Sequence, residues 1–159
     1  MGIESPTLTA FVARMALPEI NLAAWGSLIY PISLAVEGPI IMLLAASTAL
    51  ATDKTAYRKL FKYMVVMSLV LTTIHVLIAF TPLFYVVANG LLKVPVALHE
   101  PGRIGLQIMT PWTIMIAWRR LNQGVMIKYG NSQSVALGTV IRLIPLVSVL
   151  FFGITYTDW

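Results

Sequence analysis

The sequence predicts an all-α membrane protein, a polytopic bundle of helices that crosses the bilayer several times. Three observations support this prediction. Of the 159 residues, 58% are hydrophobic and only 11% are charged, and the mean hydropathy is +0.85. Soluble domains contain about 25% charged residues. The apolar residues also form runs of about 20 residues or more, the length that a helix needs to cross a bilayer. We therefore expect a single transmembrane helical domain over residues 1–159.

The charged residues are too few and too dispersed to indicate a nucleic-acid partner. The 11 Lys and Arg exceed the 6 Asp and Glu, and we interpret this excess through membrane topology. Cysteine is absent, which excludes disulfides and thiolate metal sites. We expect no metal and no other cofactor.

The first apolar segment, residues 3–17, is too short to cross a bilayer. It contains Glu4 near its start and is followed at residues 18–21 by a turn in which proline, an acid and asparagine cluster. We expect the segment to be the second half of a helix, with Glu4 more exposed than Glu37.

The second apolar run, residues 20–51, has Glu37 as its single charge. As a helix it would be about 48 Å long, whereas the apolar core of a bilayer is about 30 Å thick. We expect one long helix that tilts or protrudes, with Pro31 and Pro39 as the points where it can bend. Small residues near its end predict close packing against another helix: Ala45, Ala46, Ser47, Ala49 and Ala51.

A polar segment with four basic residues, 52–62, leads into the next helix, which we expect near residues 56–89. Asp53 is placed as its N-cap. His75 lies near the middle of the apolar run, and Pro82 is expected to kink or end the helix.

Residues 93–103 contain two prolines, a glycine and both signs of charge, and we expect an interfacial loop there. The next helix is expected near residues 104–128, with Pro111 in its interior. It crosses the membrane as far as Trp118 and continues past Arg119 and Arg120 as an amphipathic extension on the membrane surface.

The last apolar run, residues 133–156, has Arg142 as its single charge. It completes a predicted set of four membrane helices. Two basic segments, 52–62 and 119–131, contain Lys54, Arg58, Lys59, Lys62, Arg119, Arg120 and Lys128. By the positive-inside rule both should lie on the cytoplasmic face of the cell (inner) membrane.

Four ionisable residues lie at similar depths in the predicted helices: Glu4, Glu37, His75 and Arg142. With a rise of about 1.5 Å per residue, Glu37, His75 and Arg142 lie about 24, 20 and 17 Å from the cytoplasmic ends of their helices. Isolated charges are costly in a membrane, so we expect these side chains to cluster, with Arg142 as the partner of a glutamate.

Two interpretations of this cluster remain open. It is either a polar cavity that binds a substrate or couples a cation, or a fixed ion pair that only holds the helices together. In the first case, a Glu37–Arg142 contact that forms and breaks would move a proton with conformation. For His75 alone, a hydrogen-bonded packing role is the commoner one. Three prolines are hinge candidates, although proline is frequent in membrane helices: Pro39, Pro82 and Pro111.

An enzyme is not expected. His99 and Glu100 begin a His-Glu-x-x-His zinc pattern, but position 103 is Arg, and the neighbouring prolines argue against the helix that this motif needs. The sequence contains neither a phosphate-binding glycine loop nor a serine elbow, so no nucleophile, base and orienting group can be assembled.

Three features, taken in order over nearly the whole chain, resemble the multidrug and toxic compound extrusion (MATE) transporters and their ankylosis-type relatives. They are the basic segment after the second helix, the His-x-Leu-Ile-Ala stretch at residues 75–79, and residues 117–127. The last of these, AWRRLNQGVMI, is similar to an Arg…Gln-Gly segment at the cytoplasmic end of helix four in the family. The matching residues are Arg119, Arg120, Gln123 and Gly124.

The resemblance implies a fold of two six-helix bundles that exports small organic compounds in exchange for protons or sodium by alternating access. On this alignment the chain covers the end of helix one through helix five of the first bundle. It would then be an N-terminal half fragment, with the second helix bundle as its partner. Glu4 would be the acidic residue that the family often has in helix one.

Two alternatives do not need this resemblance. The chain could be a small four-helix transporter that works as a homodimer, for which a glutamate in the first helix would be suitable. It could also be a membrane scaffold or accessory subunit that does not transport, in which case the ionisable residues would form a structural network.

Overall fold

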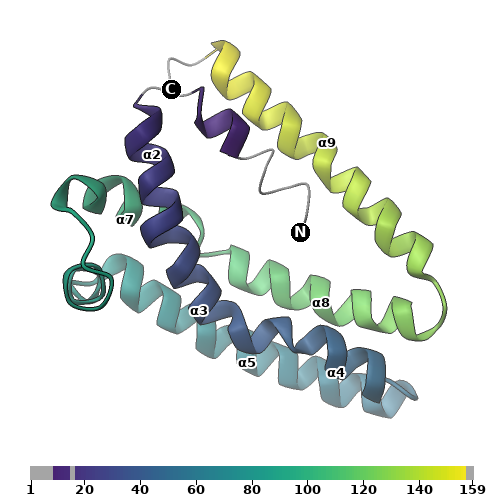
Figure 1. The fold of residues 1–159 in the computed structure, drawn as a ribbon. Helices are drawn as coiled ribbons and strands as arrows, with labels where there is room; N and C mark the ends of the chain where they lie inside the picture. Colours follow the sequence, from purple (N-terminus) through teal and green to yellow (C-terminus); the bar gives the residue numbers. More distant parts are fainter. Residues whose placement is uncertain (1–8, 15–16, 157–159) are drawn as a thin grey trace.

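The computed structural model describes residues 9–14 and 17–156, and the regular structure within these ranges is entirely helical (Figure 1). Three of the described helices are long and apolar enough to cross a membrane: Pro18–Leu50, Lys54–Phe80 and Ser132–Val149. The all-helical prediction is therefore confirmed, and the three helices are compatible with a membrane protein. The expected number of four complete crossings is not reached in the described part of the chain.

The first long helix consists of four consecutive pieces. They are α2 (Pro18–Ala24), the π-helical turn η1 (Trp25–Ile29), α3 (Tyr30–Ile41) and α4 (Leu43–Leu50). Pro31 has no N–H to donate to the preceding turn, and the wide η1 turn comes directly before it. Pro39 lies just before Met42, where α3 gives way to α4 and the chain changes direction (Figure 1). The predicted helix 20–51 and its bend near Pro39 are thus confirmed, whereas Pro31 coincides with an irregular helical turn and its bending stays a prediction.

The second long helix, α5 (Lys54–Phe80), begins where the sequence predicted. Asp53 is its N-cap and accepts a hydrogen bond of 2.7 Å from the Ala56 N–H. The predicted end near residue 89 is wrong, because Thr81 is extended and Pro82 begins a separate segment of α6 (Leu83–Tyr85) and the π-helical η2 (Val86–Leu91). Pro82 therefore ends the helix and does not merely kink it.

The expected loop at 93–103 and the expected helix at 104–128 are both corrected. A short 3₁₀ turn, η3 (Val96–Leu98), leads into α7 (His99–Ile108), and α8 (Trp112–Lys128) is a separate helix. Pro101 is compatible with α7 because it lies in the first turn, where no helical N–H partner is needed. The prediction that the neighbouring prolines prevent a helix at His99 is therefore wrong. Pro111 separates α7 from α8, and neither piece has the length of a complete crossing.

The last helix, α9 (Ser132–Tyr156), agrees with the predicted 133–156. It begins beside the end of α8, packs mainly against that helix and then diverges from the other helices (Figure 1). No side chain of Ser132–Val149 is buried.

The core consists of two apolar clusters that follow each other along the bundle. The first joins η1, α3, the end of α5, α6, η2 and α7, and contains Leu28, Ile29, Ile32, Ala79, Phe84, Ala88, Val94 and Leu106. The second joins α3, α4, α5 and α8, and contains Val36, Ile40, Leu43, Met64, Leu71, Ile116, Ala117 and Leu121. The opposite side of α5 exposes large apolar residues, as a lipid-facing surface does.

Helices α4 and α8 approach each other closely. Gly124 of α8 faces Ser47, which is completely buried, and a Cβ atom at Gly124 would lie 2.6 Å from the Leu44 carbonyl oxygen. The predicted close packing of this end of the first helix is therefore confirmed. It depends on Ser47 and Thr48, whereas Ala45 and Ala49 are exposed.

The two basic segments lie at the same end of the helices. The Tyr129 hydroxyl donates to the carbonyls of Ala51 and Thr52, both at 3.1 Å. The Lys128 ammonium donates to the Ala49 carbonyl at 2.7 Å. These contacts confirm that segments 52–62 and 119–131 share one end of the bundle.

The expected partial helix 3–17 is described only in part, with helical structure at residues 9–12. Glu4, and with it the expected comparison of its exposure with that of Glu37, lies outside the described residues.

Candidate functional site

Glu37 occupies the interior of the bundle. It lies on α3 with only 4% of its surface exposed, and Ser33, one turn earlier on the same face, is also buried. The Trp112 side chain at the start of α8 is a hydrogen-bond partner of the Glu37 carboxyl. Arg120, also on α8, acts on the same carboxyl through its positive charge. The indole N–H is the donor, since tryptophan has no acceptor.

Helices α5 and α8 contribute further buried polar side chains at this level. His75 of α5 is completely buried, and its Nε2 lies 2.9 Å from the Leu106 carbonyl oxygen of α7, to which it donates. Thr113 of α8 is completely buried as well. The packing role expected for His75 is consistent with this hydrogen bond to the backbone.

These side chains form a polar layer between the two apolar clusters. On α3, Ser33 and Glu37 flank Val36 of the second cluster and follow Ile32 of the first; on α5, His75 lies between Leu71 and Ala79. Four buried atoms of the layer have no hydrogen-bond partner among the described groups: Ser33 Oγ, Glu37 Oε1, His75 Nδ1 and Thr113 Oγ1. The layer therefore has hydrogen-bonding capacity that the protein itself does not use.

Helices α5 and α7 both end beside this layer. Polar side chains donate hydrogen bonds to the backbone carbonyls near these two ends. The carbonyls of Ala79 and Phe80, at the end of α5, accept hydrogen bonds from Arg103, and Ala79 also accepts one from Gln107. His75 likewise donates a hydrogen bond to the Leu106 carbonyl near the end of α7. Breaks of this kind are tolerated within a membrane only where protein groups or water satisfy the backbone.

Arg142 is not part of the polar layer. It lies on α9 and lines a hollow together with Arg119 and Gln123 of α8. The positive charge that acts on Glu37 is that of Arg120, so the expected Glu37–Arg142 pairing is replaced by a Glu37–Arg120 relationship. The physical reason is that α9 covers the other face of α8 from the one that packs against α3, α4 and α5.

The residues that carry the family resemblance separate onto the two faces of α8. Arg120 and Gly124 face the core, towards Glu37 and Ser47, whereas Arg119 and Gln123 face α9.

Each hinge candidate coincides with an irregularity: Pro39 with the bend after α3, Pro82 with the end of α5, and Pro111 with the start of α8. Hinge motion itself stays a prediction.

Three residues of this site were not predicted from the sequence: Ser33, Trp112 and Thr113. Ser33 could have been found from its spacing of four residues before Glu37, which places both on one helix face. Nothing in the local sequence connects Trp112 or Thr113 with a glutamate more than seventy positions earlier.

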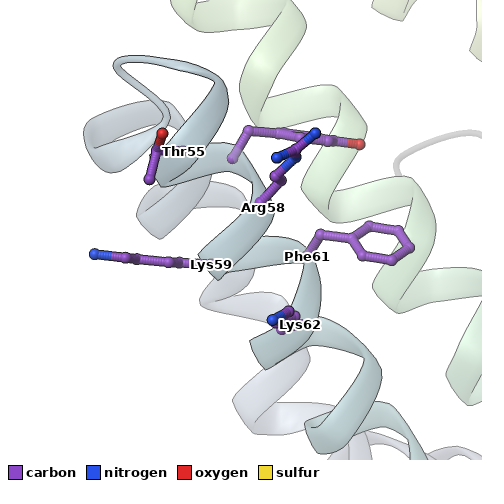
Figure 2. A pocket seen from close by; sticks show the side chains of 6 residues that line it. Thr55, Arg58, Lys59, Phe61 and Lys62 are labelled. Atoms are coloured by element: carbon purple, nitrogen blue, oxygen red, sulfur yellow. The ribbon is translucent and has the colours of Figure 1, made fainter.

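The basic end has a hollow of its own at the start of α5, shown in Figure 2. Arg58, Lys59 and Lys62 are exposed around it, and Phe61 points towards α8, where its ring packs edge-on against Trp118 at 5.7 Å. Lys and Arg beside interfacial aromatic rings are typical of the end of a membrane helix.

No family, curated protein or solved structure shows significant similarity to this chain. The described fold and site define the class of the chain as an all-helical protein with three helices that can cross a membrane and one polar layer inside its core. The resemblance to MATE transporters stays a hypothesis.

Proposed function

We propose that this chain is part of a MATE-like secondary active transporter in the cell (inner) membrane. The transporter would export small organic compounds by cation-coupled alternating access, and Glu37 would bind the coupling proton or sodium ion. A second helix bundle would complete the transport pathway. The observation that carries the proposal is a carboxyl group with an unused oxygen, buried among helices that can cross a membrane.

Burial of Glu37 supports a binding role, because an acid inside membrane helices is costly and is usually retained for function. Its neighbours are suited to a reversible site. Trp112 orients the carboxyl and Arg120 offers a competing positive charge, while Oε1 remains available to a cation. Binding of a cation to Glu37 would weaken the attraction between Glu37 and Arg120, and so couple ion binding to the position of α8.

Interrupted helices beside the layer also support this function. Transporters commonly bind substrates and ions where membrane helices are broken, because the break provides polar groups and a place to bend. Here α3 bends after Pro39, and α7 and α8 are separated at residues 109–111.

A structural network is the second candidate, because Trp112 and Arg120 both compensate the buried carboxyl. In this case the chain would belong to a membrane scaffold or accessory subunit, or the layer would only stabilise a transporter.

The test is Glu37→Gln in the intact transporter, reconstituted in liposomes and assayed with a panel of fluorescent organic compounds under an imposed proton or sodium gradient. We expect gradient-driven export to fall by about tenfold or more, with folded protein retained in the membrane. Glu100→Gln is the matched control, because Glu100 is an exposed acid outside the layer and its loss should change nothing. Unchanged export by Glu37→Gln would refute the coupling role. Loss of folded protein would favour the structural network.

A further inference from the structure

We propose that the hollow between α8 and α9 binds a phosphate group. The hollow has a volume of about 250 Å³, and its polar lining consists of Arg119, Asn122 and Gln123 from α8 and Ser134, Thr139 and Arg142 from α9. This site is separate from the polar layer around Glu37, since it lies on the other face of α8. The inference does not depend on the proposed transport function.

The described residues that line the hollow bring positive charge to it from both helices. Arg119 of α8 and Arg142 of α9 both line it, and among the described lining residues none is Asp or Glu. Glu37, the buried acid among the described residues, is influenced by the charge of Arg120, which lies on the opposite face of α8. An anion in the hollow would therefore be attracted by a guanidinium group from each helix.

Arg119 is the group that most needs an acceptor. Its Nε and Nη1 atoms are buried and have no hydrogen-bond partner among the described groups. A buried N–H of a charged group is especially costly when it is left without an acceptor. Guanidinium groups are well suited to phosphate, because their fixed, planar donors match its oxygens.

Three of the four neutral polar side chains that line the hollow already donate local hydrogen bonds. Asn122 donates to the Trp118 carbonyl at 2.8 Å, Ser134 to Asn131 Oδ1 at 2.7 Å, and Thr139 to the Val135 carbonyl at 3.0 Å. Recognition of a ligand therefore depends mainly on the two arginines, which favour a negatively charged group over a neutral hydroxyl or amide.

Two sources of phosphate fit this chemistry: the headgroup of an anionic phospholipid and a soluble phosphate ion. Apolar side chains on the same hollow, including Trp118, could contact the hydrocarbon next to a headgroup. The experiment below separates the two sources.

The full chain is reconstituted in phosphatidylcholine nanodiscs, with or without phosphatidic acid, and inorganic phosphate is added to the discs that lack it. Retained phosphatidic acid is measured by native mass spectrometry, and phosphate binding by isothermal calorimetry. We expect Arg119→Gln to weaken binding about tenfold, which is typical for loss of a charged hydrogen bond. Lys62→Gln, the matched control, removes an exposed charge outside the hollow and should change binding less than about twofold.

Gly138→Leu keeps the test valid if Arg119→Gln fails to fold. Gly138 lines the hollow, and a Cβ atom there would have no neighbouring atom within 4 Å, so there is room for a leucine side chain, which reduces the space without removing a charge. It should also weaken binding while the helix remains stable. Binding of phosphatidic acid alone identifies a lipid site, and binding of both probes identifies a general phosphate site. Equal binding by the wild type, Arg119→Gln and Gly138→Leu, or no binding of either probe, would overturn the proposal.

Discussion

Gly124 determines how closely α4 and α8 can pack. The space beside it is filled by the side chain of Ser47 and by the Leu44 carbonyl oxygen. A backbone carbonyl cannot rotate away as the end of a long side chain can, so this contact restricts residue 124 to glycine. Gly138 of α9 provides the comparison, because no atom lies within 4 Å of the position of its missing Cβ.

We predict that Gly124→Ala lowers the free energy of unfolding by about 1–3 kcal/mol, the usual cost of overpacking. Alanine gains about 1 kcal/mol from helix propensity, so Gly138→Ala should be neutral or stabilising by up to about that amount. The measurement is unfolding in detergent micelles followed by circular dichroism. Equal stabilities of the two variants would show that α4 and α8 do not pack as closely as described.

At the scale of the elements, α5 and α7 stabilise each other's ends, because a side chain of each helix donates hydrogen bonds to backbone carbonyls near the end of the other. Arg103 of α7 donates to the Ala79 and Phe80 carbonyls and to the Tyr85 hydroxyl, each at 3.3 Å. His75 of α5 in turn donates to the Leu106 carbonyl near the end of α7. These reciprocal hydrogen bonds explain how two helices can end inside a largely apolar bundle.

We predict that Arg103→Gln loosens the last turn of α5. Loss of the guanidinium leaves the carbonyls of this turn with fewer donors, so amide hydrogen exchange at residues 79–81 should accelerate by about tenfold. Hydrogen–deuterium exchange with mass spectrometry measures this change. Lys93→Gln is the control, since Lys93 is an exposed cation in the segment before α7. If both variants exchanged alike, the reciprocal hydrogen bonds would not hold the end of α5.

At the scale of the whole molecule, charge is distributed unequally between the two ends. The end that joins α4 to α5 and α8 to α9 carries Lys54, Arg58, Lys59, Lys62 and Lys128, and Tyr129 and Lys128 connect its two segments. The other end of α5 faces the segment that contains Lys93 and Arg103. By the positive-inside rule the first end should be cytoplasmic.

We predict that Thr55→Cys and Asn131→Cys are labelled from the cytoplasmic side and Val96→Cys from the opposite side. The chain contains no native cysteine, so single-cysteine variants need no background correction. The measurement is labelling by a membrane-impermeant maleimide in intact cells and in inverted vesicles. Labelling of Thr55→Cys and Asn131→Cys from opposite sides would exclude the described arrangement as the one in the membrane.

The sequence by itself determined the features that depend on neighbouring residues. Long apolar runs predict helices that match Pro18–Leu50 and Ser132–Tyr156, because hydropathy and chain length are local properties. The N-cap at Asp53 follows from a polar residue directly before a helical run, and the bend near Pro39 from a missing N–H.

Only the tertiary structure decided which charge meets Glu37. Depth along a helix predicted Arg142, but pairing also depends on which face of α8 turns towards α3 and which towards α9. The same holds for the break between α7 and α8. A proline can interrupt a helix or begin one, and here the hydrogen bonds from His75, Arg103 and Gln107 stabilise the ends that the break creates. Those contacts join residues more than twenty positions apart, so no local pattern in the sequence contains them.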